Sequence, residues 1–497
     1  MSLLMDVLTA CGVGFLALLA WGFVIYADYA WKLRKFRGPA ALPIVGQLYD
    51  SKVVRVMRYL SDASKKYGKM FLFWPGNKAM LVVMEIEAAR QVLTDTRTFL
   101  KGADYTEKFS VVFGEGLVTS NGETHKHDRG CLMKYFQPAH IEKNLSMLCA
   151  HTRTMMDEVL EPAVGSGKSV DMQDYFHMTA LRIFGSFSVS HDYSAPDQRS
   201  FAKRLNHIVS WGSHVIGEHI ILGIPMWNII PRVRKLRHYV KVVDEHVDTL
   251  IDARIAARKA GNECPDDTLT AMLDDNQSRD QMHAQLRTLL SAGHDTTAFF
   301  GCYMVYLLAQ HPEVQDKVKE EVQRVLQGRT ELTADDIANL KYCRMVLQET
   351  LRLYTVIPFV NRTASKDYTL KGTKTTIPKG TVVLVPLTLM NRDPDLWSDP
   401  NDFRPERFAE ITGHTSARNG YLPFGYGSRT CIGNTLALIE GTCMIALLMQ
   451  RYRFAQDPGF KPQLIPGISL VSKNGIHVRI ERDDGMVAGP NPNEASE

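Results

Sequence analysis

PFGYGSRTCIGN, residues 423–434, places a single cysteine, Cys431, among three glycines. The apolar residues that follow recur at helical spacing, so Cys431 is expected just before a helix N-terminus. Unpaired backbone N–H groups and the positive end of the helix dipole face such a position. Both features lower the pKa of a thiol and favour the thiolate. The stretch therefore predicts a thiolate at Cys431.

The residues around this thiol suit a flat, bulky partner. Glycines such as Gly425 and Gly433 allow backbone turns and the close approach of a planar group. Arg429 supplies a cation for an anionic appendage, and Phe424 can pack against the group. The pattern indicates an axial iron ligand that faces a planar ring. Two alternatives stay open: a buried inert cysteine, or a catalytic nucleophile whose general base comes from elsewhere in the fold.

A long helix is expected over residues 281–310, and its centre reads LLSAGHDTTAFFG. The segment is apolar on nearly all sides, which favours a place in the core. Asp295 is costly to bury unless it is paired or protonated, and Thr296 is expected to hydrogen-bond to the carbonyl of Ala292. One interpretation is a kinked helix with a solvated polar face. The other is a polar chamber in which Asp295 and Thr296, as candidate catalytic residues, pass protons to a bound group.

The segment QETLRL contains Glu349 and Arg352 one helical turn apart, where they can form an ion pair. The surrounding residues are apolar, so the pair is expected to be buried and to need a further partner. Arg407, in FRPERF, is the candidate third member. Two unrelated surface charges are the alternative. Glu321 and Arg324 have the same spacing and are interpreted as a solvated surface pair.

Composition and charge exclude some classes of protein. The 497 residues are 45% hydrophobic and 23% charged, and a formal net charge of +4 gives no case for a nucleic-acid partner. The eight cysteines form no CxxC pair. Neither a disulfide framework nor a zinc site is indicated, and most of the thiols are expected to be buried in a protein of a reducing compartment.

The first residues predict a membrane anchor. Residues 7–27 carry no charge and are long enough to span a bilayer, which takes about 20 residues. Basic residues follow at 32, 34, 35 and 37, so the positive-inside rule predicts a single-pass protein with everything after the helix in the cytosol. A cleaved signal peptide is the alternative, although no small-residue cleavage site is obvious.

The rest of the chain predicts one domain. We expect an anchor at 1–31, a basic, proline-containing hinge at 32–48, the catalytic domain at 49–482 and a disordered tail at 483–497. Helical periodicity dominates, with short β-rich runs, so the fold class is mainly α with a minor sheet (α+β). Helices are expected at 60–67, 141–160, 201–209, 239–260, 281–310, 312–327, 343–354 and 435–450, and strands at 70–75, 79–85, 381–387 and 475–481.

At this point a family resemblance joins the separate motifs. FGYGSRTCIG resembles the heme-binding signature of cytochrome P-450 enzymes, Phe-x-x-Gly-x-Arg-x-Cys-x-Gly, with every fixed position filled. AGHDTT resembles the oxygen-activating motif of their long central helix, ETLR their Glu-x-x-Arg pair, and PERF the segment that follows. All four occur in the family's order. The resemblance runs from the proline hinge to about residue 482.

The resemblance implies a domain around a buried heme b, with Cys431 as the thiolate ligand of the iron. Arg429, Arg362, Arg129 and His125 would contact the heme propionates. His125, in HKHDR, stands where tryptophan is common, and Lys134 stands where many members have proline; both are departures from the family. The resemblance also assigns Glu349, Arg352 and Arg407 to a structural triad, Ala292 and Gly293 to the border of the oxygen groove, and Asp295 and Thr296 to proton delivery.

The resemblance is to the microsomal type, so the protein would be a monooxygenase of the endoplasmic reticulum membrane with its catalytic domain in the cytosol. It would insert one atom of O2 into a lipophilic substrate, such as a sterol, a fatty acid or another lipid. Electrons would come from NADPH through a separate cytochrome P-450 reductase-type partner. Substrate would touch the loop at 104–117, with Phe109, Val112 and Phe113. It would also touch Phe299 and Phe300, the strand start at 356–360 with Val356 and Ile357, and the turn around Ser469 and Leu470. The apolar run 219–227 is followed by basic residues, so the segment 219–230 is expected either to dip into the membrane beside the substrate entrance or to belong to the ordinary core. A heme-binding sensor without turnover and a hydroperoxide isomerase are the alternatives.

Overall fold

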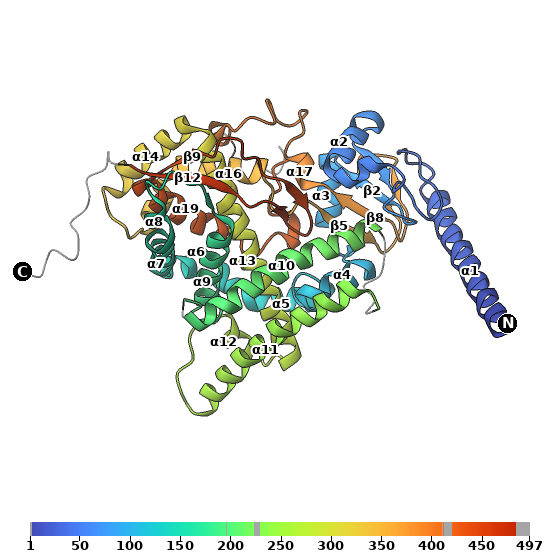
Figure 1. Cartoon of the computed structure of the whole chain (residues 1–497), viewed down its shortest axis with the longest axis horizontal. Helices are drawn as coiled ribbons and strands as arrows, with labels where there is room; N and C mark the ends of the chain where they lie inside the picture. Colours follow the sequence, from blue (N-terminus) through green and yellow to red (C-terminus); the bar gives the residue numbers. More distant parts are fainter. Residues whose placement is uncertain (1, 195, 223–228, 410, 412–419, 484–497) are drawn as a thin grey trace, which may run out of the picture.

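A computed structural model of the chain describes residues 2–194, 196–222, 229–409, 411 and 420–483. The fold is mainly helical with small sheets, as the periodicity predicted. Figure 1 shows a broad helical body, a sheet region beside helices α2 (Val56–Tyr67) and α3 (Ile86–Thr94), and helix α1 (Ser2–Lys32) standing apart from it. Residues 484–497 of the expected disordered tail and part of the expected membrane-dipping segment lie outside the described residues.

The largest sheet has the strand order β1-β2-β8-β5-β3. Strands β2 and β8 are parallel, and the other neighbours are antiparallel. A second sheet has the order β4-β12-β9, and β10-β11 and β6-β7 form hairpins. The strands are Met70–Phe73 (β1), Met80–Val83 (β2), Phe99–Leu100 (β3), Val170–Asp171 (β4), Val360–Ala364 (β5), Tyr368–Thr369 (β6), Thr376–Ile377 (β7), Val382–Val385 (β8), Tyr452–Gln456 (β9), Leu464–Pro466 (β10), Leu470–Ser472 (β11) and His477–Arg482 (β12).

The helical body surrounds one long central helix, α13 (Arg279–Gln310), whose Ser278 side chain caps its first turn. Further helices are Ala103–Phe113 (α4), Gly122–Met133 (α5), Pro138–Lys143 (α6), Leu145–Met155 (α7), Glu161–Ala163 (α8), Gln173–Val189 (α9), Pro196–Leu222 (α10), Pro231–Lys259 (α11), Thr268–Asp274 (α12), Pro312–Leu326 (α14), Ala334–Asn339 (α15), Lys341–Leu353 (α16), Leu387–Met390 (α17) and Asn434–Arg451 (α19).

Helices α9 and α13 pack closely because α13 has glycines on the facing side. A Cβ atom on Gly293 would lie 2.3 Å from the ring of Phe184, and one on Gly301 would lie 2.5 Å from the ring of Phe176. The two glycines and the two phenylalanines are each eight residues apart, which places each pair on one helix face. Small residues therefore bring the two helix backbones together.

Two expectations about local structure are wrong. The segment 104–117 was expected to be a loop, but most of it is helix α4, because apolar residues recur at helical spacing between Gly102 and Gly114. The helix expected at 141–160 is split: α6 ends at Lys143, α7 follows, and residues 156–160 form a π-helical turn. Helix α9 was not predicted at all, because it is buried on most sides and lacks a polar face.

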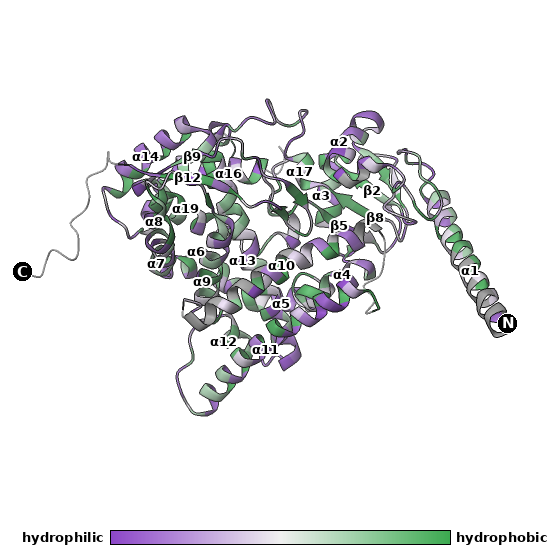
Figure 2. Ribbon diagram, in the orientation of Figure 1, coloured by the Kyte–Doolittle hydropathy of each residue, from purple (hydrophilic) through white to green (hydrophobic). Residues whose placement is uncertain are grey.

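Residues 32–48, the expected hinge, pack against the end of the largest sheet that carries β1. Tyr26 donates to the carbonyl of Ala41 (3.0 Å), and its ring lies 4.9 Å from that of Trp74. The buried Gln47 side chain donates to the carbonyl of Pro39 and accepts the backbone N–H of Trp74. Helix α1 itself has little cover, and its segment Gly12–Lys32 is long and apolar enough to cross a membrane by length and composition. Figure 2 shows hydrophobic residues along α1 outside the body.

Candidate active site

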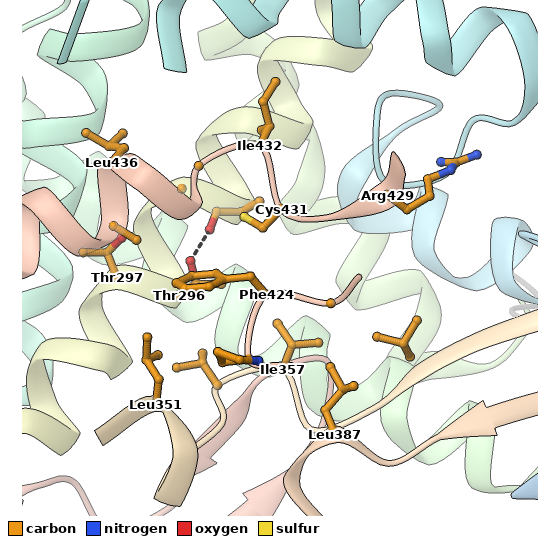
Figure 3. A pocket seen from close by; sticks show the side chains of 18 of the residues that line it. Thr296, Thr297, Leu351, Ile357, Leu387, Phe424, Arg429, Cys431, Ile432 and Leu436 are labelled. Carbon is orange, nitrogen blue, oxygen red and sulfur yellow. Dashed lines mark hydrogen bonds between the residues drawn. The ribbon is translucent and has the colours of Figure 1, made fainter. Parts of the chain in front are cut away.

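A cavity of about 260 Å³ is lined by helix α13, the start of α19, the segment before β5 and the loop 423–433. Figure 3 shows Cys431, Phe424 and Thr296 around this space. Most of its wall is apolar, and the apolar lining includes Leu289, Phe300, Val356, Ile357, Val360 and Leu436. An apolar chamber with few polar groups favours a nonpolar guest.

Backbone geometry fixes the loop that carries Cys431. The backbone N–H of Cys431 donates to the carbonyl of Phe424 (2.9 Å). Gly425 and Gly427 have φ of 76° and 78°, a region that favours glycine. A Cβ atom on Gly427 would lie 2.9 Å from the carbonyl oxygen of Leu93, so glycine is required there for close packing as well. The accessible surface of Cys431 lies on the cavity wall.

The expected lowering of the Cys431 pKa is wrong. Helix α19 begins at Asn434, close after the cysteine as predicted, and the Gly433 N–H and the Arg129 charge both favour the thiolate. Burial is nevertheless the larger effect, and it raises the pKa of Cys431 above its ordinary value. A metal cation is the group that would reverse this balance, because a coordinating thiol is deprotonated.

Cations gather beside the cavity without an anion to balance them. Four cationic side chains lie close enough together to lower one another's pKa or the pKa of His125. They are Lys101, Arg129, Arg362 and Arg429. No ion pair joins any of these four side chains to a carboxylate within the described ranges. The Arg429 Nη2 atom donates to the carbonyl of Ser120 (2.7 Å), but Nη1 is buried without a hydrogen-bond partner. A negatively charged ligand would balance the charge of this cluster.

His125 was singled out from the sequence, whereas Lys101 was not. His125 is buried beside this cluster, and burial together with Arg429 lowers its pKa to about 3, so it is a neutral imidazole there. It does not itself line the cavity. Lys101 does line it and was missed. Its Nζ lies 3.8 Å from the ring centroid of Tyr105, and no local motif around the lysine signals this position.

The polar centre of α13 is buried, so the alternative of a solvated face is wrong. The predicted bond is confirmed: Thr296 Oγ1 donates to the carbonyl of Ala292 (2.9 Å; Figure 3). Ala292, Gly293 and Thr296 line the cavity, whereas Asp295 does not. Asp295 instead accepts a bond from Ser469 Oγ (2.7 Å), and burial raises its pKa to about 7. The structure thus separates the acid from the alcohol.

The structure brings Glu349, Arg352 and Arg407 together. Arg352 Nε and Nη2 donate to the two Glu349 oxygens at 2.7 and 2.8 Å, and Arg407 Nε donates to Oε1 at 2.9 Å. Glu349 and Arg352 have no exposed surface. Remaining Arg352 donors reach the carbonyls of Asn391, Pro400 and Asp402. The alternative of two unrelated surface charges is therefore wrong.

Glu321 was expected on the surface and is buried instead. Its carboxylate accepts the backbone N–H groups of Tyr342 and Cys343, both at 2.9 Å, at the first turn of α16. Arg324, its expected partner, is exposed and 3.7 Å away. The carboxylate therefore caps the helix that carries the Glu349 pair. Sequence spacing alone cannot separate such a cap from a surface pair.

The candidate substrate residues fall into two groups. Val356 and Ile357 line the cavity, together with Phe300. Phe299 and Leu470 are buried in the core around α13 and are absent from the cavity wall. Phe109, Val112 and Phe113 lie on α4, whose Phe109 ring stacks on that of Tyr105 (3.9 Å), and they are likewise absent from the wall.

A mostly helical domain with a cysteine loop, an apolar cavity and an unbalanced cationic cluster has the features expected of a heme-thiolate enzyme. The chain belongs to the cytochrome P450 family, whose model matches residues 36–478. It is 28% identical to "Putative cytochrome P450 CYP13A3" of Caenorhabditis elegans over 97% of this chain and 99% of that protein. It is 26% identical to "Cytochrome P450 4A24" of Sus scrofa (95% and 96%) and to "Cytochrome P450 3A6" of Oryctolagus cuniculus (91% and 92%).

The residues present fit the heme that this family implies. The Cys431 side chain is on the cavity wall, the orphaned Arg429 Nη1 needs an acceptor, and a Cβ atom on Gly425 would meet nothing within 4 Å. When bound, heme ligated by a thiolate supplies the activation of O2 that makes members of the family monooxygenases. Cys431 would ligate the iron, and the cationic cluster would hold the two carboxylates of the porphyrin.

Proposed function

We propose that this monooxygenase inserts one oxygen atom into a lipophilic small molecule, with electrons supplied by NADPH through a separate reductase. The balanced reaction is RH + O2 + NADPH + H⁺ → ROH + NADP⁺ + H2O. The observation that carries the substrate class is the cavity, whose wall beside Cys431 is mainly apolar. A sterol, a fatty acid or another lipid has the chemistry that such a wall favours.

The roles of the site residues belong to the same proposal. Arg429, Arg362 and Arg129 neutralise the porphyrin carboxylates, and the neutral His125 packs beside them. Val356 and Ile357 touch substrate, and Ala292 and Gly293 border the space for O2. Thr296 faces that space, and Asp295 supplies protons to it from its buried position. Glu349, Arg352 and Arg407 hold the segments behind the cysteine loop.

Location follows from helix α1. Its exposed apolar segment supports a single membrane anchor, and the basic residues after it support a cytosolic catalytic domain, in the endoplasmic reticulum membrane. The anchored domain would receive lipophilic substrate from the bilayer and electrons from a reductase on the same surface.

The first experiment is the absorption spectrum of the reduced full-length protein with carbon monoxide, for wild type and Cys431→Ser. We expect a strongly red-shifted Soret band in wild type and its loss in the variant. Thr430→Ser is a matched control in the same loop and should keep the band. A folded, heme-loaded wild type without the band would refute thiolate ligation by Cys431.

A second experiment separates the alternatives. NADPH consumption is measured with a P-450 reductase in vesicles, with and without a panel of sterols and fatty acids. Stimulation by a substrate that yields a hydroxylated product supports the proposed reaction. Conversion of a lipid hydroperoxide under anaerobic conditions, without reductase, would indicate an isomerase instead, and tight heme binding without any turnover would indicate a sensor.

A further inference from the structure

The turn between strands β10 and β11 reaches the polar centre of α13. Ser469, in this turn, donates its hydroxyl proton to Asp295 Oδ2 (2.7 Å), and the serine has no exposed surface. Two more bonds hold the turn: Tyr303 OH donates to the carbonyl of Leu470, and the Leu470 N–H donates to the carbonyl of Val356 (2.7 Å). The contact is therefore part of a fixed arrangement.

Asp295 depends on this serine because little else stabilises its charge. The carboxyl is 3% exposed, and its other oxygen, Oδ1, is buried without a hydrogen-bond partner. No ion pair joins Asp295 to a cation anywhere in the described ranges. Burial raises the pKa of Asp295 to about 7, and the bond from Ser469 is the one interaction that opposes this rise.

The titratable neighbours of Asp295 do not replace the serine. On α13 itself, Tyr303 keeps a raised pKa and stays neutral. The preceding residue, His294, is paired with His177 of α9 (Nδ1 of His177 to Nε2 of His294, 3.3 Å), and burial lowers the pKa of both imidazoles. All three groups are uncharged near neutral pH, so none offers Asp295 a counter-charge.

We propose that Ser469 is a positioning residue that holds the Asp295 carboxyl against the β10–β11 turn and keeps it available in its ionised form. This inference rests on the proposed role of Asp295 in proton delivery. A carboxyl that exchanges protons repeatedly must be accessible both as the acid and as the carboxylate. Because no cation faces Asp295, the hydrogen bond from Ser469 is what stabilises the carboxylate. The hydroxyl of the adjacent Thr296 donates to the Ala292 carbonyl instead.

Val356 connects the cavity wall to the β10–β11 turn. That residue lines the cavity and accepts the Leu470 N–H, and Leu470 follows Ser469 directly. One backbone hydrogen bond therefore links the cavity wall to the turn that carries Ser469.

The test is an infrared pH titration of the full-length holoenzyme, in which the C=O stretch of the protonated Asp295 is identified by its loss in Asp295→Asn. In Ser469→Ala we expect the midpoint of this band to rise by roughly one to two pH units, because a hydrogen bond to the charged form is lost. Ser469→Cys keeps the size with a weaker donor and should give an intermediate rise. It also serves if the alanine variant does not fold.

Ser472→Ala is the matched control. Ser472 is a buried serine of the same hairpin, and its hydroxyl donates to the Gly475 carbonyl (2.6 Å) and to Asn474 of its own loop. Its removal should leave the Asp295 midpoint unchanged. A midpoint in Ser469→Ala equal to that of Ser472→Ala would overturn the proposal.

Turnover separates failure of this inference from failure of the proposed function. The fraction of NADPH electrons recovered in product is measured as a function of pH for the same variants. If Asp295→Asn keeps wild-type coupling while the infrared shift in Ser469→Ala appears, Ser469 tunes Asp295 but Asp295 is not a proton donor. If Asp295→Asn loses coupling and Ser469→Ala matches wild type in both readouts, the donor role stands and the positioning role of Ser469 is refuted.

Discussion

The close packing of α9 on α13 predicts that a methyl group at Gly293 overpacks the contact with Phe184. A Cβ atom there would lie 2.3 Å from both Cδ2 and Cε2 of the Phe184 ring and 2.7 Å from Cγ. Ordinary carbon contacts begin near 3.5 Å, so the ring would have to move by about 1 Å. Phe184 is itself buried in the core, and a rigid ring has little freedom to withdraw.

Two opposing terms set the size of the effect. Replacing glycine by alanine inside a helix stabilises it by about 1 kcal/mol. Overpacking a core costs about 1–3 kcal/mol. Gly293→Ala should therefore be neutral to about 2 kcal/mol less stable than wild type.

Gly130 provides the control, because it lies inside helix α5 and a Cβ atom there would meet nothing within 4 Å. Gly130→Ala should gain the helix term alone, so the two variants should differ by about 1–3 kcal/mol in the free energy of unfolding by urea. Combining Gly293→Ala with Phe184→Leu should recover a similar amount in a double-mutant cycle. Equal stabilities of the two alanine variants, with no coupling to position 184, would refute the steric argument.

Three further predictions concern buried charges. Arg429→Gln should lower the ratio of bound heme to protein measured by absorbance, because its buried donors lose their charge, whereas Arg58→Gln on the exposed face of α2 should not. Glu349→Gln should lower the free energy of unfolding by about 3–5 kcal/mol, because the fully buried Arg352 loses its counter-charge. A decrease below about 1 kcal/mol, which is the range measured for exposed ion pairs, would contradict this prediction. Glu440, buried with an unpartnered Oε1, has its pKa raised by burial to about 8. The unfolded chain releases this proton near pH 4.5, so wild-type stability should fall as pH rises from there to 8, and Glu440→Gln should flatten that fall; parallel pH profiles would argue against it.

The parts of the site that were predicted correctly are local in sequence. Cys431 precedes a helix because the residues after it have helical spacing, and the Thr296 bond to Ala292 spans one turn. The fold class follows in the same way from periodicity. What was wrong or missed depends on contacts between distant segments. The Cys431 pKa reflects burial by the whole domain, and Glu321 meets the start of α16.

The place of Lys101 in the cationic cluster and the bond from Ser469 to Asp295 were missed for the same reason. Lys101 lies between β3 and α4, and the fold brings it close to Arg362 and Arg429. Nothing in the local sequence FLKGADY indicates that this lysine lies near other cations. Ser469 lies 174 residues after the carboxylate that it meets. A single sequence offers no periodicity over such a separation, so the pairing is visible only once the chain is folded.

The position of Ser469 along the chain has a consequence for biosynthesis. Helix α13 leaves the ribosome well before the residues that complete its polar centre, because Cys431 and the β10–β11 turn come later. Domains generally fold as units, so Asp295 becomes fully buried only after these later segments have been synthesised. The heme site is likewise complete only after Cys431 has left the ribosome, so stable heme binding requires nearly the whole chain.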